Sequence, residues 1–202
     1  MSVMIVEDVG NKKDKHIVKH RWFDAHDVEV LRAPLPVGDY ILYTETVEDV
    51  IRRKAKRGVD LKKLDFLGSY KVCVDTKRDM QEIVGNICGV QHERFRDECV
   101  LAKNNGIQLY ILVENPDGIG SVEDVSHWQN PRMKRYETIA AKHREGKWMR
   151  IPLPKAPPTT GERLAKAMKT MEEKYSCRFM FCRPEEAGAK IVELLGGSGD
   201  ES

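Results

Sequence analysis

Short apolar segments alternate with longer amphipathic segments along the 202-residue chain. Short, continuous apolar runs are typical of buried strands, and apolar residues three and four positions apart are typical of helices. This pattern predicts strands at residues 3–6, 28–31, 40–43, 71–75, 108–113 and 178–181. It predicts helices at residues 16–26, 46–64, 79–88, 91–105, 121–128, within 131–149, at 161–175 and from 184 onward.

The order of these elements predicts an α/β fold with a mixed central sheet and helices on both faces. Pro34 and Pro36 require extended backbone between the second and third strands, which we expect to pair as a hairpin. Four prolines predict that residues 151–160 form an ordered linker or a crossover. We expect one domain over residues 1–195 and a flexible tail at 196–202.

The composition is that of an ordinary globular protein, with 41% hydrophobic and 33% charged residues. The apolar runs, such as residues 109–113, are too short to span a bilayer, and the first residues lack a signal-peptide pattern. The five cysteines are odd in number and have no CxxC spacing, so we expect reduced thiols. We therefore expect a cytoplasmic protein with no membrane association.

Local charge is more informative than the net charge of +2. Residues 52–63 hold seven basic side chains against one acid, and residues 132–150 form a second basic stretch. Each is either a solvated helix face or a surface that contacts phosphates. The candidate DNA-binding residues are Arg52, Arg53, Lys54, Lys56, Arg57, Arg132, Lys134 and Arg135.

Carboxylates and a lysine stand at the ends of predicted strands. Asp39 lies where one strand begins, and Asp75 and Lys77 lie where another ends. Because side chains alternate along a strand, Asp75 and Lys77 should point to the same side. Phosphodiester hydrolysis needs a hard cation held by one or two carboxylates, and a nearby lysine can orient water or offset phosphate charge. Asp8 follows the first strand and can approach the same end of the sheet.

Other features have two readings each. His16 and His20 have the i, i+4 spacing of a zinc pair on a helix, but no third ligand has a matching context. Trp128 precedes a turn and a basic run, so it either stacks on a base or is buried beside the turn.

Several segments together resemble the XPF-type nuclease family of the PD-(D/E)XK superfamily. That family has a Gly-Asp-Tyr strand followed by a Val-Glu-Arg-Lys strand. Here residues 35–42 read Leu-Pro-Val-Gly-Asp-Tyr-Ile-Leu and residues 72–77 read Val-Cys-Val-Asp-Thr-Lys. The resemblance continues through residues 5–8, 91–99, 109–114 and 161–195, and is interrupted near 46–70 and 115–150, which we regard as insertions.

The resemblance implies a restriction-endonuclease-like core, an Mg²⁺ or Mn²⁺ cofactor and a DNA substrate. It implies that Asp39 and Asp75 are metal ligands, that Lys77 is catalytic and that Asp8 is a further acidic ligand. Family members also pair through related domains, so the resemblance makes a homodimer an expectation. The stand-alone form suggests a bacterial or phage DNA-processing enzyme.

The chain departs from the family pattern around this core. Asp75 replaces the family's Glu, and Thr76 replaces its Arg. The family usually has an acid four residues after the lysine, and here that position is Gln81. Glu82, the next residue, is a candidate to assist in its place. The upstream Arg-Glu pair is replaced by Val9 and Gly10.

Three hypotheses follow. The first is a Mg²⁺-dependent endonuclease that hydrolyses DNA phosphodiester bonds, at branched or flapped structures. The second is a non-catalytic DNA-binding module that keeps the nuclease fold. The third is a nuclease directed at RNA.

Overall fold

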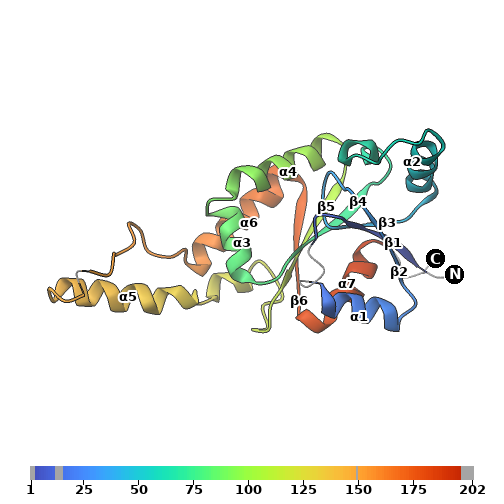
Figure 1. The fold of residues 1–202 in the computed structure, drawn as a ribbon. Helices are drawn as coiled ribbons and strands as arrows, with labels where there is room; N and C mark the ends of the chain where they lie inside the picture. Colours follow the sequence, from blue (N-terminus) through green and yellow to red (C-terminus); the bar gives the residue numbers. More distant parts are fainter. Residues whose placement is uncertain (1–2, 12–15, 149, 197–202) are drawn as a thin grey trace.

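The structure is a computed structural model that describes residues 3–11, 16–148 and 150–196. A mixed six-stranded sheet forms its centre, with helices on both faces (Figure 1). The expected α/β class is therefore confirmed. The strands are β1 (Met4–Asp8), β2 (Glu29–Ala33), β3 (Tyr40–Leu42), β4 (Val72–Lys77), β5 (Gln108–Glu114) and β6 (Cys177–Cys182).

The strands lie in the order β2-β1-β3-β4-β5-β6. β3 runs antiparallel to both of its neighbours, β1 and β4. The other pairs, β1 with β2, β4 with β5 and β5 with β6, are parallel. The carboxyl ends of β4 and β5 therefore meet at one edge of the sheet, where ligands of open α/β sheets commonly bind.

Two hydrophobic cores cover the two faces of the sheet. On one face α3 (Met80–Ile87), α4 (His92–Asn104) and α6 (Gly161–Tyr175) pack over the larger core. On the other face α1 (Ile17–Ala25) and α7 (Ala187–Leu194) pack over the smaller one. Alternation along β4 divides its side chains between them, because Cys73 enters the larger core and Val74 the smaller.

The expected hairpin between the second and third strands is wrong, because β1 lies between them. Val6 pairs with Leu31 on one side and with Ile41 on the other. The chain from β2 to β3 instead crosses the carboxyl end of β1. There the Leu35 amide donates to Asp8 Oδ1 at 2.9 Å. Extended backbone through Pro34 favours such a crossing over a tight turn.

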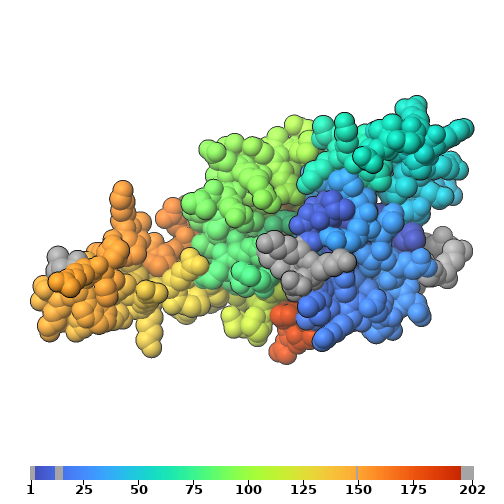
Figure 2. Space-filling view, viewed as in Figure 1, coloured from blue at the N-terminus to red at the C-terminus, as the bar shows by residue number. Residues whose placement is uncertain are grey.

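The expected insertions lie at opposite ends of the molecule (Figure 1). The first contains α2 (Glu45–Lys56) and the short 3-10 helix η2 (Lys63–Phe66). In the second, the 3-10 helix η3 (Asp124–His127) replaces the expected helix at 121–128, and α5 (Pro131–Arg144) leads away from the sheet. We call residues 131–158 the arm, which projects from the body in Figure 2. A further 3-10 helix, η4 (Pro184–Glu186), precedes α7. No helix of the described residues is long and apolar enough to cross a membrane.

Helix α6 approaches η3 so closely that its first residue must be glycine. A Cβ added at Gly161 would lie 2.7 Å from the Trp128 carbonyl oxygen and closer still to that of Val125. This contact joins the base of the arm to the helical layer of the larger core.

We predict that Gly161→Ala lowers the free energy of unfolding by about 1–3 kcal/mol, because the added methyl overpacks two backbone carbonyls. Gly85→Ala is the matched control, because a Cβ at that position in α3 meets nothing within 4 Å. It should raise the free energy of unfolding by about 0.5–1 kcal/mol. Urea denaturation of both variants measures the difference, and equal effects would contradict the packing argument.

Candidate active site at the carboxyl ends of β4 and β5

The turn into β3 presses against β4, and this contact places Asp39. Gly38 has φ +75°, and a Cβ there would lie 2.9 Å from the Cys73 Cβ. Glycine is therefore required both for the backbone conformation and for the close approach. The Gly38 amide donates to Glu98 Oε1 at 3.0 Å, and the Asp39 amide donates to the Val74 carbonyl at 2.8 Å.

The Asp39 carboxylate is held by the strand that carries the other candidate residues. Its Oδ2 accepts hydrogen bonds from the Thr76 amide at 2.9 Å and from Thr76 Oγ1 at 2.6 Å. Two donors on one oxygen fix the orientation of the carboxylate. Thr76 thus orients the first acid.

Asp75 and Lys77 point to the same side of β4, as the strand period predicts. Lys77 Nζ lies 2.6 Å from Asp75 Oδ2, and both residues are buried, with 7% and 4% of their surfaces exposed. The ammonium group also lies 5.1 Å from the centre of the Phe95 ring on α4. The ring face adds a cation–π contact to the ion pair.

Burial raises the pKa of the Asp75 carboxyl to about 8, although the positive charge of Lys77 opposes the shift. The negative charges of Glu98 and Asp39 raise this pKa further. For Lys77, burial acts to lower the pKa, but the charges of Asp75 and Asp39 outweigh it and hold the pKa above its ordinary value. The site thus concentrates negative charge in a dry environment and places one lysine within it.

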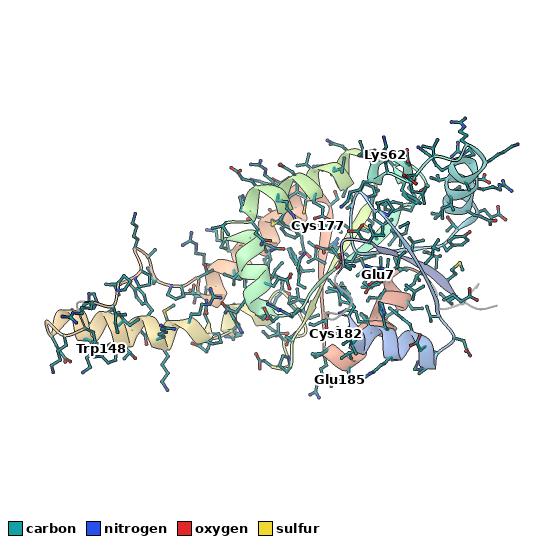
Figure 3. All side chains as sticks on the ribbon, in the orientation of Figure 1. Glu7, Lys62, Trp148, Cys177, Cys182 and Glu185 are labelled. Atoms are coloured by element: carbon teal, nitrogen blue, oxygen red, sulfur yellow. The ribbon has the colours of Figure 1, made fainter. Side chains whose placement is uncertain are left out.

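A second ion pair forms the opposite wall. Lys19, on α1, lies 2.5 Å from Glu114 Oε1 at the end of β5, and both side chains are buried. Burial raises the pKa of Glu114, and Lys19 opposes that shift. Beside this pair, Tyr40 Oη lies 2.8 Å from His16 Nδ1 and donates to Glu7 Oε1 at 3.0 Å. Glu7 is labelled in Figure 3.

These side chains surround one cavity of about 200 Å³. Its lining contains four carboxylates and four cations, and the cations Arg78 and Arg94 are exposed at its rim. The lining residues are Gly10, Asn11, His16, Lys19, Asp39, Asp75, Thr76, Lys77, Arg78, Glu82, Arg94 and Glu114. Because the four carboxylates balance the four cations, the lining suits a divalent cation at the acids together with an anionic ligand at the basic rim.

A solved structure resembles the chain as a whole. It is XPF from Aeropyrum pernix in complex with DNA, which has 16% sequence identity and a TM-score of 0.52. The match covers 97% of this chain and 64% of that one. The two proteins share a fold. At this identity the likeness concerns the fold alone, and no protein-family model and no curated protein matches the chain.

The candidate residues Asp39, Asp75 and Lys77 thus lie around one cavity of an XPF-like fold, and Glu82 joins them. Glu82 Oε2 accepts from the Arg78 amide at 3.1 Å. Asp8 does not line the cavity, because its Oδ1 is taken by the Leu35 amide and its Oδ2 lies 3.8 Å from Lys63 Nζ.

Gln81 points away from the cavity, toward the arm. Its Nε2 donates to Asn130 Oδ1 at 3.0 Å. Trp128, beside that asparagine, is 8% exposed, so the interpretation as a buried residue next to a turn is correct. The histidines are used in hydrogen bonds, and His20 Nε2 lies 3.1 Å from Glu7 Oε1.

The candidate DNA-binding residues fall into two groups that the fold separates. Arg52, Arg53, Lys54, Lys56 and Arg57 lie on or next to α2, and Arg132, Lys134 and Arg135 lie on α5 at the other end of the molecule (Figure 1). In the first group, Arg52 pairs with Asp49, and Lys54 Nζ lies 2.8 Å from Asp65 Oδ2. The base of α5 is linked to the cavity through α3, because Gln81 contacts Asn130 and Glu82 lines the cavity.

Reasoning from the sequence did not find Lys19, Glu98 or the role of Thr76. Glu98 directly precedes Cys99 on the inner face of α4, so its place at the edge of an apolar stripe is a usable signal. Lys19 carries no such signal, because its pairing with Glu114 depends on how α1 crosses the sheet.

The donor set fits a magnesium-type ion better than a zinc-type one. Within the described residues, no three His, Cys, Asp or Glu side chains form a group that could hold a metal. Mg²⁺ needs only one or two carboxylates and keeps several waters. Burial raises the pKa of the Asp75 carboxyl. A bound cation would favour the ionised form of this carboxyl and so lower that pKa.

We predict a pH-dependent loss of stability that originates at Asp75 when divalent cations are absent. The pKa of Asp75 is about 8 in the fold, whereas an unfolded aspartate has a pKa of about 3.9. Between these values the unfolded chain releases a proton that the fold retains, so the free energy of unfolding should fall as pH rises. The slope should be smaller for Asp75→Asn in denaturation with EDTA. Equal slopes for both proteins would contradict the raised pKa.

Proposed function

We propose that the protein is a metal-dependent endonuclease that hydrolyses DNA phosphodiester bonds. The observation that carries this proposal is the convergence of Asp39, Asp75 and Lys77 on one cavity at the carboxyl ends of β4 and β5. The match to an XPF structure that contains DNA supports DNA as the substrate class. The match covers only 64% of the neighbour's chain. Any activity that this chain shares with the whole neighbour is therefore proposed.

In this proposal Asp39 and Asp75 hold Mg²⁺ or Mn²⁺, which when bound supplies a Lewis acid for the phosphate and an acidified water. Thr76 orients Asp39 through its amide and hydroxyl groups. Burial of Asp75 excludes bulk water from the carboxylate. The two acids therefore act as a fixed pair on neighbouring strands.

Lys77 supplies the positive charge inside the cavity. Its Nζ, held beside Asp75 and over Phe95, is placed to orient a water or to offset the charge that grows on the phosphate. Glu82 assists at the mouth, and Arg78 and Arg94 attract the DNA backbone.

The direct test is cleavage of DNA with Mg²⁺ or Mn²⁺. We expect Asp39→Ala, Asp75→Ala and Lys77→Met each to lower the cleavage rate by about 100-fold or more, because each removes charge at the reacting phosphate. Asp97→Ala is the matched control, because Asp97 is an exposed acid on α4 outside the cavity. Full activity of Asp39→Ala or Asp75→Ala would overturn the proposal.

Metal titration separates this proposal from the non-catalytic alternative. Calorimetry with Mn²⁺ should show binding to the wild type and at least tenfold weaker binding to Asp75→Asn, since loss of one ligand removes a principal charge contact. DNA binding without any divalent-cation binding would favour a non-catalytic module instead. Matched DNA and RNA substrates then test the substrate class, and preferential RNA cleavage would contradict the DNA assignment.

A further inference from the structure

The arm has a net positive charge, whereas the rest of the chain, taken as a whole, has a net negative charge. It has eight basic residues and two acidic ones, a net charge of +6. Since the whole chain is +2, the remaining residues carry −4. Of the arm's cations, Lys142 and Lys147 pair with Glu145, and the other six make no ion pair with a described residue. In the other basic stretch, residues 52–63, three cations pair with acids, namely Arg52 with Asp49, Lys54 with Asp65 and Lys63 with Asp8. The arm therefore offers a polyanion more unpaired cations than that stretch does.

The base of the arm is anchored next to the cavity. Asn130 is 6% exposed, and its Oδ1 caps α5 by accepting from the Arg132 amide at 3.0 Å. The same oxygen accepts from Gln81, whose neighbour Glu82 lines the cavity. Asn130 Nδ2 donates to the Thr159 carbonyl at 2.9 Å, which ties the returning chain to the outgoing one. The arm is thus joined at both of its ends to the wall of the candidate active site.

The described residues at the tip of the arm make two backbone turns. Gly146, with φ +70°, ends α5, and the Lys147 amide donates to the Lys142 carbonyl at 2.7 Å. This six-to-one hydrogen bond is the mark of a Schellman motif. The Ile151 amide then donates to the Trp148 carbonyl at 2.8 Å, and His143 Nε2 lies 2.6 Å from the Ile151 carbonyl oxygen.

This turn presents an aromatic side chain to solvent. Trp148 is 48% exposed at the far end of the arm (Figure 3), with Ile151 and Leu153 also exposed. Its φ is +55°, a backbone conformation that is uncommon for a bulky residue. The inner face of α5 is covered, because Ile139 is buried and lines a groove with Pro152 and Pro154. The exposed apolar surface of the arm therefore runs from Trp148 at the tip into the returning segment 151–157.

We propose that the arm is a second DNA-binding site, in which the cations follow the phosphate backbone and Trp148 stacks on a nucleobase. This inference rests on the proposed function for the identity of the polyanion. Aromatic side chains beside a basic track are the usual platform for unpaired bases, and apolar side chains can also wedge between base steps. Trp148 would then mark an unpaired or unstacked base in the substrate.

The distribution of charge favours DNA over a membrane surface. A helix that lies on a membrane needs a continuous exposed apolar face. On α5 the apolar face is covered by the proline segment, and cations such as Arg132, Lys134 and Arg135 are exposed along the helix. The exposed apolar residues lie at the tip and on the returning segment 151–157, not along a face of α5. The arm therefore matches an elongated polyanion better than a membrane surface.

The length of α5 sets the distance between the base of the arm, beside the cavity, and Trp148 at its tip. Its 14 residues span roughly 21 Å at about 1.5 Å per residue. At about 3.4 Å per nucleotide of one strand, this corresponds to roughly six nucleotides. We therefore place the stacked base about six nucleotides beyond the DNA segment at the base of the arm.

The test uses the full chain in EDTA, so that binding is measured without cleavage. The probe is a DNA duplex with a single-stranded extension, in which the fluorescent base 2-aminopurine is moved one position at a time. We expect one short window of altered fluorescence with the wild type and its loss with Trp148→Ala. Affinity should fall about tenfold for Trp148→Ala and largely recover for Trp148→Phe, since stacking is retained. Val90→Ala, at a fully exposed apolar residue far from the arm in the sequence, is the control.

The outcomes separate this inference from the proposed function. Unchanged affinity and fluorescence for Trp148→Ala would overturn the stacking site, whether or not the protein cleaves DNA. Loss of the fluorescence window with Trp148→Ala would support it even if no cleavage is found with any metal. Binding to anionic phosphatidylserine vesicles but not to DNA, with a shift in tryptophan emission, would assign the tip to membranes and also overturn the inference.

Discussion

The close approach of Gly38 to Cys73 is the contact on which the arrangement of the site depends. It lets the crossing segment from β2 lie against β4, where the Asp39 amide reaches the Val74 carbonyl and the Asp39 carboxylate reaches Thr76. Any side chain at this position would push the two strands apart and move Asp39 away from Asp75. The same approach brings the Gly38 amide to Glu98, so helix α4 is fixed to the turn as well. One missing Cβ therefore sets the relative positions of three carboxylates.

The buried ion pairs around the cavity are expected to add little to the free energy of unfolding. Desolvation of a lysine and a carboxylate commonly offsets their attraction, and apolar residues of similar size can replace such a pair without loss. Here two pairs, Lys77 with Asp75 and Lys19 with Glu114, line one cavity of about 200 Å³. Strongly perturbed ionisable groups in a cleft are typical of functional sites. Their arrangement is more readily explained by chemistry at the cavity than by the packing of the sheet.

Much of the fold could be predicted from the local pattern of apolar residues. The predictions that were wrong or missing concern contacts between residues remote in sequence. The buried run before Asp75 predicted β4, and the strand period predicted that Asp75 and Lys77 share a side. The neighbours of each strand were not predictable in this way, because apolar alternation is the same whichever strand lies alongside. The insertion of β1 between β2 and β3 therefore overturned the expected hairpin. Lys19 was missed for the same reason, since its partner Glu114 is remote in sequence and the two meet only through the crossing of α1.

The small net charge of the chain is the sum of a basic arm and an acidic body. This separation of charge affects how a phosphate reaches the site. The body carries −4 in spite of its basic stretch at residues 52–63, and the arm carries +6, so the arm is the larger source of net attraction for a polyanion. At the cavity itself, four cations only balance four carboxylates, and two of those cations are already committed to buried pairs. A phosphate near Asp39 and Asp75 is therefore repelled unless the exposed Arg78 and Arg94, or a divalent cation, offset those acids. A basic arm anchored beside an acid-lined cavity resolves this conflict, because it holds the polyanion close while leaving the carboxylates free to bind a cation.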